Sequence, residues 1–423
     1  MIKKIIRKLL SNRFIYKIAK DAHESYRIES SLTMNYEVPE ITPFNFIKSE
    51  FSGKRINLLI PALSEKHVFG GISTALRFFD KVRLDFPIAR IIVTDEVSVE
   101  LKENQFYSDW KLNDLSADDI NSNSIVVSGN RSCASIAISE NDYFVTTAWW
   151  TTYNAFKMIE WQSATFNIYE RKLIYFVQDY EPGFYPWSTR YALAESTYLN
   201  SKATIPVFNT KLLSDFFIKN GYLYPQSYYF EPIINPVLSA ARDQRKNECR
   251  ERKILIYGRP GVERNLFNLI VQSISIWAEL YPKAKEWKVF SAGEKHPEII
   301  LSDKVTINSL GKLNLDEYVH QLSTSSIGIS LMLSPHPSYP PLEMASFGMK
   351  VITNSYSNKK LSKSSSNIVE PENLTPEKIA NLLSQLCDVF EEKHEVIYEE
   401  NLFSSSGIEF SFINDITKLI QKN

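Results

Sequence analysis

Short apolar runs alternate with longer amphipathic stretches along this chain, and they do so in two successive series. The first series has strand candidates at 56–60, 89–94, 124–127, 143–147, 172–177 and 204–208, and the second has them at 253–257, 288–291, 304–307, 326–332 and 350–353. The helical segments between them include 73–82, 152–164, 211–220, 266–280, 315–323 and 343–347. Strands that alternate with helices build βα units, whose strands lie parallel in one sheet. The pattern predicts two α/β halves that meet near residue 240.

These two series also give the expected domain limits. We expect a first Rossmann-like domain at 55–238, a second at 239–400, and a terminal helix at 401–423 that returns to the first domain. Residues 1–54 are expected to form a basic amphipathic helix and a connector. From Ile2 to Ala22, apolar residues recur at helical spacing among lysines and arginines. Such a helix could lie on an anionic membrane or pack on its own domain, and both interpretations stay open.

The composition argues against several classes of protein. The 48 Lys and Arg nearly balance the 49 Asp and Glu, so the charge gives no reason to expect a nucleic-acid partner. The three cysteines lie far apart, which leaves a disulfide framework or a metal site unsupported. No apolar run reaches the roughly 18 to 20 residues that cross a bilayer, and the basic start lacks a cleavage site. We therefore expect a cytoplasmic protein, with residues 2–22 as the element that could contact the inner face of the cell membrane.

A glycine pair, Gly70 and Gly71, stands between the first predicted strand and its helix. Backbone N–H groups at such a helix start can bind an anion, because the helix dipole is positive there. The same turn could equally start the helix without any ligand. The chain lacks both the GxGxxG and the GxxxxGK[ST] patterns, so a dinucleotide-binding dehydrogenase and a P-loop ATPase are unsupported.

The first strand of the second series ends in a turn that contains Gly258, Arg259, Arg264 and Asn265. Arginine forks match phosphate oxygens, and open α/β sheets bind ligands at the carboxyl ends of their strands. A diphosphate is therefore the natural ligand of Arg259 and Arg264. The alternative is that these arginines are surface residues paired with neighbouring glutamates.

A proline-rich loop follows the strand candidate 326–332 and contains His336, Ser338 and Tyr339. After it, Glu343 is expected to open a short helix, where a carboxylate is favourable to the dipole and can also accept hydrogen bonds from a sugar hydroxyl. The alternative is a first-turn glutamate that serves only the helix. Isolated histidines more often satisfy local hydrogen bonds than catalyse, so His336 is a candidate and His67 and His320 are not.

Two carboxylates, Asp179 and Glu181, follow a strand candidate of the first series. They lie among aromatic residues, namely Tyr180, Phe184, Tyr185 and Trp187. Aromatic faces stack on the C–H surfaces of sugars while carboxylates bind hydroxyls, so we interpret this segment as an acceptor site. A rigid aromatic loop whose carboxylates cap local groups is the alternative.

Taken together, these segments resemble the nucleotide-sugar glycosyltransferases of the GT-B fold, in particular glycosyltransferase family 4. Arg259 and Arg264 match that family's GR turn with a basic residue five positions later. Glu343 through Gly348 match the second half of its E-x7-E motif, whereas Pro335 stands at the place of the first Glu. With this departure and the segments 147–151 and 177–187, the chain most resembles bacterial rhamnosyltransferases that build S-layer glycan and related rhamnose-rich chains.

The resemblance implies two Rossmann-like domains whose parallel sheets face a cleft, and transfer of L-rhamnose from dTDP-L-rhamnose to a growing, possibly lipid-linked, surface glycan with retention. No metal or other cofactor is implied. The catalytic candidates are Asp179, Glu181 and Arg264. The donor-binding candidates are Gly70, Gly71, Gly258, Arg259, Arg264, Asn265, His336, Ser338, Tyr339 and Glu343. A nucleotide-sugar epimerase of the same fold, or a non-catalytic protein that binds a glycan or nucleotide sugar, remains the alternative.

Overall fold

The computed structural model describes residues 37–422 except 64–69, 101–106, 132–133, 232, 246–248, 303–304, 393–395, 400–401 and 403–408. The chain divides into two units, Met1–Thr42 and Pro43–Asn423. In the first unit the described residues are 37–42, which include the short 3-10 helix η1 (Pro39–Ile41). The predicted basic helix at residues 2–22 lies outside the described residues.

The second unit contains two large sheets, and the first of them has eight strands. They are β2 (Arg55–Ile60), β3 (Ile88–Val93), β4 (Lys111–Asn113), β5 (Ser124–Val127), β7 (Asp142–Thr146), β8 (Leu173–Val177), β9 (Thr204–Asn209) and β10 (Tyr228–Phe230). Their order is β10-β9-β8-β7-β2-β3-β5-β4, and every neighbouring pair is parallel. A separate parallel pair joins β1 (Asn45–Lys48) to β6 (Ser135–Ile138). Chain order reverses at β2, where open α/β sheets bind their ligands.

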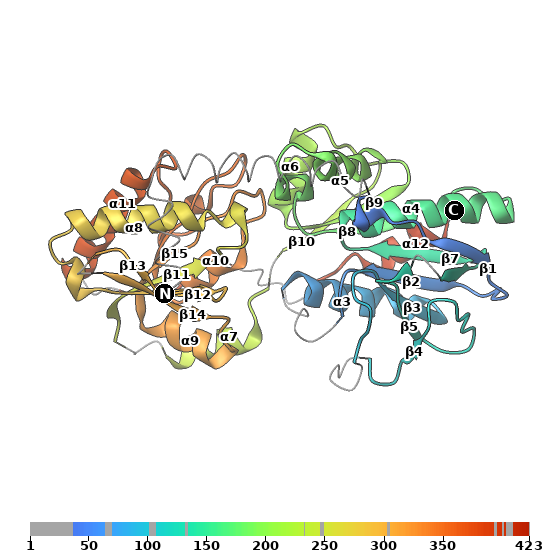
Figure 1. The fold of residues 1–423 in the computed structure, drawn as a ribbon, viewed down its shortest axis with the longest axis horizontal. Helices are drawn as coiled ribbons and strands as arrows, with labels where there is room; N and C mark the ends of the chain where they lie inside the picture. The colour runs from blue at the N-terminus through green and yellow to red at the C-terminus, as the bar shows by residue number, and fades with distance from the viewer. Residues whose placement is uncertain are drawn as a thin grey trace, which may run out of the picture. The chain divides into compact units, whose positions relative to one another are not determined.

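Helices cover both faces of this first sheet (Figure 1). One face carries α3 (Gly71–Val82) and α12 (Ile413–Gln421), and the other carries α4 (Trp149–Phe166), α5 (Thr189–Leu199) and α6 (Lys211–Lys219). Successive side chains of a strand point to opposite faces, so Leu58 packs in the core under α3 and α12 while Leu59 packs under α4. Ile416 of α12 is fully buried in the same core as Leu58.

The second sheet has seven strands and is also covered on both faces (Figure 1). They are β11 (Glu251–Gly258), β12 (Lys288–Gly293), β13 (Ile299–Ile300), β14 (Thr306–Gly311), β15 (Ser325–Ile329), β16 (Lys350–Ile352) and β17 (Ile368–Val369), in the order β13-β14-β12-β11-β15-β16-β17. All pairs are parallel except β13 with β14. One face packs on α8 (Phe267–Leu280) and α11 (Pro376–Glu392), and the other on α7 (Pro236–Gln244), α9 (Leu315–Thr324) and α10 (Tyr339–Ser346).

The expected fold class, α/β with two Rossmann-like domains of the GT-B kind, is confirmed by these two sheets, whose strands are parallel apart from β13. One local expectation is wrong, because Glu343 does not open a helix. Helix α10 begins at Tyr339, and Pro340 and Pro341 occupy its first turn. Proline is tolerated there, since the first N–H groups of a helix have no partner within it. In the described part of the chain, no helix is long and apolar enough to cross a membrane.

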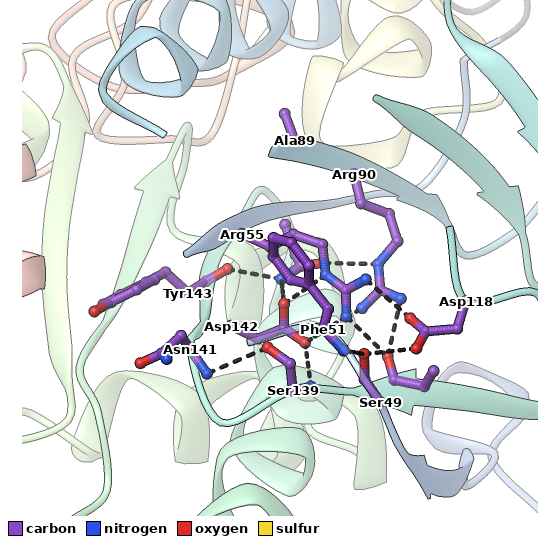
Figure 2. A network of polar contacts seen from close by, with 12 residues as sticks. Ser49, Phe51, Arg55, Ala89, Arg90, Asp118, Ser139, Asn141, Asp142 and Tyr143 are labelled. Carbon is purple, nitrogen blue, oxygen red and sulfur yellow. Dashed lines mark hydrogen bonds and ion pairs between the residues drawn. The ribbon is translucent and has the colours of Figure 1, made fainter. Parts of the chain in front are cut away.

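A buried charge network lies at the amino ends of the central strands of the first sheet (Figure 2). Arg55, the first residue of β2, donates to both carboxylate oxygens of Asp142, the first residue of β7, at 2.7 and 2.9 Å. Arg90 of β3 lies 3.7 Å from the same carboxylate. Both guanidiniums also donate to the carbonyl of Ala137 in β6, at 3.3 and 2.9 Å. The network therefore ties the small sheet to the large one, at the end opposite to the carboxyl ends of the strands.

Candidate functional site

The turn after β11 is fixed by close packing against its neighbours. A Cβ added to Gly258 would lie 2.0 Å from the Ser291 hydroxyl oxygen, so only glycine fits there. The Gly258 carbonyl accepts the backbone N–H of Glu294 at 2.8 Å. The buried Asn265 amide donates to the carbonyl of Leu331 at 3.2 Å. These contacts hold the turn between the carboxyl ends of β12 and β15, with Arg259 and Arg264 on it.

Arg264 is the arginine of this turn that reaches the aspartate predicted to be catalytic. Its Nε lies 4.0 Å from Oδ2 of Asp179, and its guanidinium lies 3.9 Å from the centre of the Phe184 ring. Nε has no hydrogen-bond partner among the described residues. Burial lowers the pKa of Arg264, Asp179 opposes this change, and the charge of Arg259 adds to it. The described residues therefore leave the Nε–H donor of Arg264 without an acceptor.

Asp179 follows β8 and is buried. Its Oδ1 accepts the backbone N–H of Tyr180 at 2.8 Å and a short hydrogen bond from the hydroxyl of Ser334. Because Ser334 follows β15, Asp179 joins a loop of the first sheet to a loop of the second. The structure thus brings together Asp179 and Arg264, two of the three predicted catalytic residues.

His336 presents a donor that the described residues leave unused. Its Nδ1 accepts the backbone N–H of Ser338 at 3.0 Å, so the proton of the neutral ring is on Nε2. Nε2 is buried and has no partner in the described part of the chain. Burial lowers the pKa of His336 to about 4, with Lys359 and Arg264 adding to this change and Asp179 opposing it. The ring is therefore neutral near pH 7 and offers one N–H group.

Lys359 is a site residue that the sequence analysis missed. Its side chain is 1% exposed, and its ammonium donates to the carbonyl of Met332 at 2.9 Å. That carbonyl also accepts from the Asn354 amide at 3.1 Å. Burial lowers the pKa of Lys359 to about 8, and Asp179 opposes this change. Its place after a strand of the second series, β16, was the one signal in the sequence that could have found it.

Three further donor candidates follow His336 in the chain: Ser338 precedes α10, and Tyr339 and Glu343 lie within it. Ser338 has a φ of 69°, and the Tyr339 ring centre lies 5.7 Å from that of His336. Glu343 is one helical turn after Tyr339, so the two side chains share a face of the helix. Its Oε2 accepts the Tyr318 hydroxyl at 2.8 Å, and burial raises the pKa of Glu343 to about 7 against the effect of that bond.

Glu181, the third predicted catalytic residue, has quite different surroundings. Its Oε2 accepts the hydroxyls of Tyr175 at 2.6 Å and Tyr198 at 3.4 Å, inside the first domain. Burial raises the pKa of Glu181 to about 7, opposed chiefly by the Tyr175 bond. The structure therefore places this carboxylate in a tyrosine pocket, whereas Asp179 meets the second sheet.

Gly70 and Gly71 lie at the start of α3, beside the loop that contains Asp179. Gly70 has a φ of 52°, which glycine adopts without strain. A Cβ on Gly71 would lie 1.9 Å from Oε1 of Gln178, the residue before Asp179. This helix start therefore packs against the end of β8, and His67 lies outside the described residues.

Two family models match this chain. The WsaF N-terminal domain matches residues 55–211 and the WsaF C-terminal domain matches residues 252–384, which together make up more than half of the 423 residues. The chain belongs to the WsaF family. Asp179 lies in the WsaF N-terminal domain, and Arg264, His336 and Lys359 lie in the WsaF C-terminal domain.

Comparisons with individual proteins extend this result. The chain is 34% identical over 182 residues to the O-antigen biosynthesis protein RfbC of Myxococcus xanthus, covering 43% of this chain and 14% of that protein. Among solved structures it is similar to sucrose-phosphate synthase from Thermosynechococcus elongatus, with 11% identity, a TM-score of 0.48, and coverage of 80% of this chain and 90% of that one. It is also similar to WaaG, a glycosyltransferase involved in lipopolysaccharide biosynthesis, with 10% identity, a TM-score of 0.48, and coverage of 87% and 100%.

Proposed function

We propose that this WsaF-family chain is a glycosyltransferase that moves a sugar from a nucleotide-sugar donor to a growing cell-surface glycan. The similarity of part of the chain to an O-antigen biosynthesis protein supports the glycan part of this proposal. The sequence resemblance to rhamnosyltransferases supports dTDP-L-rhamnose as the donor, and the resemblance to glycosyltransferase family 4 supports retention at the anomeric carbon.

One observation carries the proposal, namely the excess of positive charge around Asp179. Arg264 and Lys359 are both electrostatically coupled to this carboxylate, and Arg259 is coupled to Arg264. Two cations, Arg264 at 4.0 Å and the buried Lys359, thus act on Asp179, and Arg259 adds positive charge beside Arg264. Buried charge is costly unless it is paired, so the arrangement favours a dianionic ligand. The diphosphate of a nucleotide sugar has the charge and the acceptor oxygens that these groups require.

The chemistry then follows from the contacts. The bond between the anomeric carbon and the diphosphate oxygen breaks, a hydroxyl oxygen of the acceptor bonds to that carbon, and the hydroxyl proton is lost. Arg264 and Lys359 stabilise the charge that grows on the leaving diphosphate. The free Nε2–H of His336 would donate to a hydroxyl of the donor sugar, and Glu343 would accept from the sugar of the nucleotide. Asp179 would orient the acceptor hydroxyl or take its proton.

A second candidate function rests on Pro335, which replaces the first Glu of the family 4 motif. Without that carboxylate, the chain could bind a nucleotide sugar or glycan and recruit it without transferring the sugar. Tight nucleotide binding without turnover would favour this second function.

The test is to incubate the full chain with dTDP-L-rhamnose, UDP-glucose or GDP-mannose, each with and without a rhamnose-containing oligosaccharide. Nucleotide release that needs the acceptor, together with a product heavier by one sugar in mass spectrometry, is the expected result. EDTA is expected to leave the rate unchanged. Nucleotide release without acceptor, or no release from any donor, would overturn the proposed transfer.

A further inference from the structure

The aromatic residues after Asp179 have different environments, although the sequence pattern predicted the same role, lining a sugar site, for all of them. The Phe184 ring lies under the Arg264 guanidinium, and the Tyr185 hydroxyl accepts from the buried Trp149 indole at 2.9 Å. Trp187, in contrast, is 93% exposed. Its ring stacks on that of Tyr191, with 5.9 Å between the ring centres and 6° between the planes. Trp187 is therefore the residue of this segment that offers a broad aromatic face to solvent.

Tyr191, the ring on which Trp187 stacks, is held in place by a series of hydroxyl contacts. The Tyr191 hydroxyl lies 3.4 Å from that of Tyr180, which lies 3.0 Å from that of Tyr222. Tyr222 in turn donates to a carboxylate oxygen of Glu195 at 2.9 Å. The backbone N–H of Tyr191 also donates to the N-cap hydroxyl of Ser188 at 3.3 Å. Tyr191 is thus fixed before any ligand binds, so little entropy is lost when a ring stacks on the pair.

The same pair is continuous with the candidate acceptor site. Tyr180, whose hydroxyl meets Tyr191, donates its backbone N–H to Asp179 at 2.8 Å. The short helix η5 (Glu181–Phe184) joins the two features and carries the ring that contacts Arg264. A chain of sugars with one end at Asp179 would therefore meet the aromatic pair along the same loop.

The chemistry of the surroundings favours a sugar over a lipid or a protein partner. The residues that follow Trp187 are Ser188, Thr189 and Arg190, all exposed and polar. Large apolar patches mark lipid and protein contacts, whereas here one flat aromatic face lies beside hydroxyl and charged groups. Aromatic faces stack on the C–H surfaces of pyranose rings while polar neighbours bind the hydroxyls.

We propose that Trp187 and Tyr191 form a distal subsite for the acceptor glycan, which binds a sugar remote from the reacting hydroxyl. This inference rests on the proposed glycosyl transfer and adds a selectivity to it. The subsite is expected to select acceptors of several sugars over a single sugar, because a monosaccharide bound at Asp179 has no second ring to stack on the aromatic pair. Such selectivity suits an enzyme that extends a chain rather than one that starts it.

The test compares Trp187→Ala with wild type on a rhamnose monosaccharide and a rhamnose tetrasaccharide. An aromatic stack contributes about 0.5 to 1.5 kcal/mol, so KM for the tetrasaccharide is expected to rise roughly three- to tenfold, with kcat and dTDP affinity unchanged. KM for the monosaccharide is expected to stay the same, and Trp187→Phe should restore part of the loss. Tyr169, which is 94% exposed, provides the matched control as Tyr169→Ala.

Equal effects on both acceptors, no effect on either, or the same effect in Tyr169→Ala would overturn the subsite. If the wild-type chain transfers no sugar at all, binding of the tetrasaccharide can still be followed by saturation-transfer NMR. Binding by wild type that Trp187→Ala abolishes would then support the subsite although the proposed transfer has failed. No binding by wild type would overturn it.

Discussion

The carboxylate of Asp179 accepts a hydrogen bond from the hydroxyl of Ser334, although the two residues lie 155 positions apart in the chain. Asp179 follows β8 of the first sheet, and Ser334 follows β15 of the second. The Ser334 oxygen also accepts the backbone N–H of His336 at 2.9 Å. The carboxylate that we propose for the acceptor is therefore tied to the loop that we propose for the donor sugar.

Replacing Asp179 by Asn keeps the size of the side chain and removes its charge. If the carboxylate orients or deprotonates the acceptor hydroxyl, kcat should fall roughly tenfold or more, while dTDP affinity measured by calorimetry is not weakened. Glu181→Gln is the matched control. Burial raises the pKa of Glu181 to about 7, so this carboxyl is partly neutral near pH 7 and Gln resembles it. A comparable loss of kcat in both variants would contradict the separate roles of the two carboxylates.

Replacing Arg264 by Ala tests the donor site. A hydrogen bond to a charged group contributes about 1.5 to 3 kcal/mol, so dTDP binding should weaken roughly ten- to a hundredfold, and kcat should also fall because charge grows on the leaving diphosphate. Glu343→Ala should weaken binding without the same loss of kcat. Wild type should bind dTDP more tightly than UDP or GDP.

The control for this prediction is Arg252→Ala. Arg252 lies on β11, the first strand of the same domain, and its Nε pairs with the carboxylate of Glu391 at 2.6 Å. Its replacement should leave nucleotide binding unchanged. Unchanged dTDP affinity after Arg264→Ala would show that the turn after β11 has a structural role and does not bind the donor.

Much of the fold could be predicted from the sequence, because the central strands are continuous apolar runs. The candidate at 124–127 coincides with β5, and the candidate at 172–177 differs from β8 by one residue. The outer strands could not be found in this way. β4 has three residues, none of them buried, and β1 has one partly buried residue among exposed ones, so neither carries a periodic pattern.

The site shows the same division between local and long-range information. Arg264 and Asp179 each follow a predicted strand, where open α/β sheets bind ligands. The arginine pair of the turn singled out Arg264, and the aromatic neighbours singled out Asp179, although they pointed equally to Glu181. Lys359 also follows a predicted strand, β16, but nothing near it in the sequence marks it as buried, because its ammonium is held by the carbonyl of Met332, 27 positions earlier. The four aromatics after Asp179 likewise have one signature in the sequence, and only their tertiary contacts separate Trp187 from the rest.

Lys359 should make nucleotide binding depend on pH. Burial lowers the pKa of Lys359 to about 8, so the ammonium is charged below that pH and attracts a diphosphate, and it is neutral above it. The affinity for dTDP should therefore fall as the pH rises from about 7 to about 9. Lys359→Met should weaken binding at pH 7 by roughly tenfold and remove this dependence.

Proton uptake gives an independent measurement for the same lysine. A bound diphosphate favours the charged ammonium, so wild type should take up a proton on binding dTDP near pH 8.5, roughly half a unit above the free pKa. Calorimetry in buffers of different ionisation enthalpy measures this uptake. Lys359→Met should show none. Equal proton uptake in both proteins would assign the pH dependence to another group.

Deleting residues 1–22 tests the predicted basic helix, which lies outside the described residues. The deletion should reduce binding to liposomes of anionic lipid, because basic residues and buried aliphatic side chains act together at such surfaces. Turnover with an acceptor free in solution should stay the same, since all candidate site residues follow residue 55. Liposome binding that survives the deletion would show that residues 1–22 do not mediate membrane contact.

Replacing Asp142 by Asn tests the buried charge network at the amino ends of the first sheet. Arg55 and Arg90 are each 1% exposed and share this carboxylate, so the variant leaves two buried guanidiniums without their main counter-charge. Breaking a buried ion pair costs about 3 to 5 kcal/mol, which urea unfolding would measure. Asp118→Asn is the milder comparison, because Asp118 is partly exposed and Arg55, at 3.2 Å, is the cation that it pairs with. Its other oxygen accepts from the Ser49 hydroxyl at 2.7 Å and the Glu50 backbone N–H at 3.1 Å. A loss near 1 kcal/mol is expected, at the upper end of the range for exposed pairs.

The same carboxylate predicts how stability changes with pH. Burial opposes the ionisation of Asp142, but the charge and hydrogen bonds of Arg55 outweigh it, so the pKa of Asp142 in the folded chain lies below its ordinary value. A carboxyl with a lowered pKa stabilises the fold above the unfolded pKa of about 3.9, and this stabilisation is lost as the pH falls toward the lower folded value. The free energy of unfolding of wild type should therefore decrease below about pH 4, and Asp142→Asn should lose less over the same range. Parallel acid curves for the two proteins would contradict a charged Asp142 in the core.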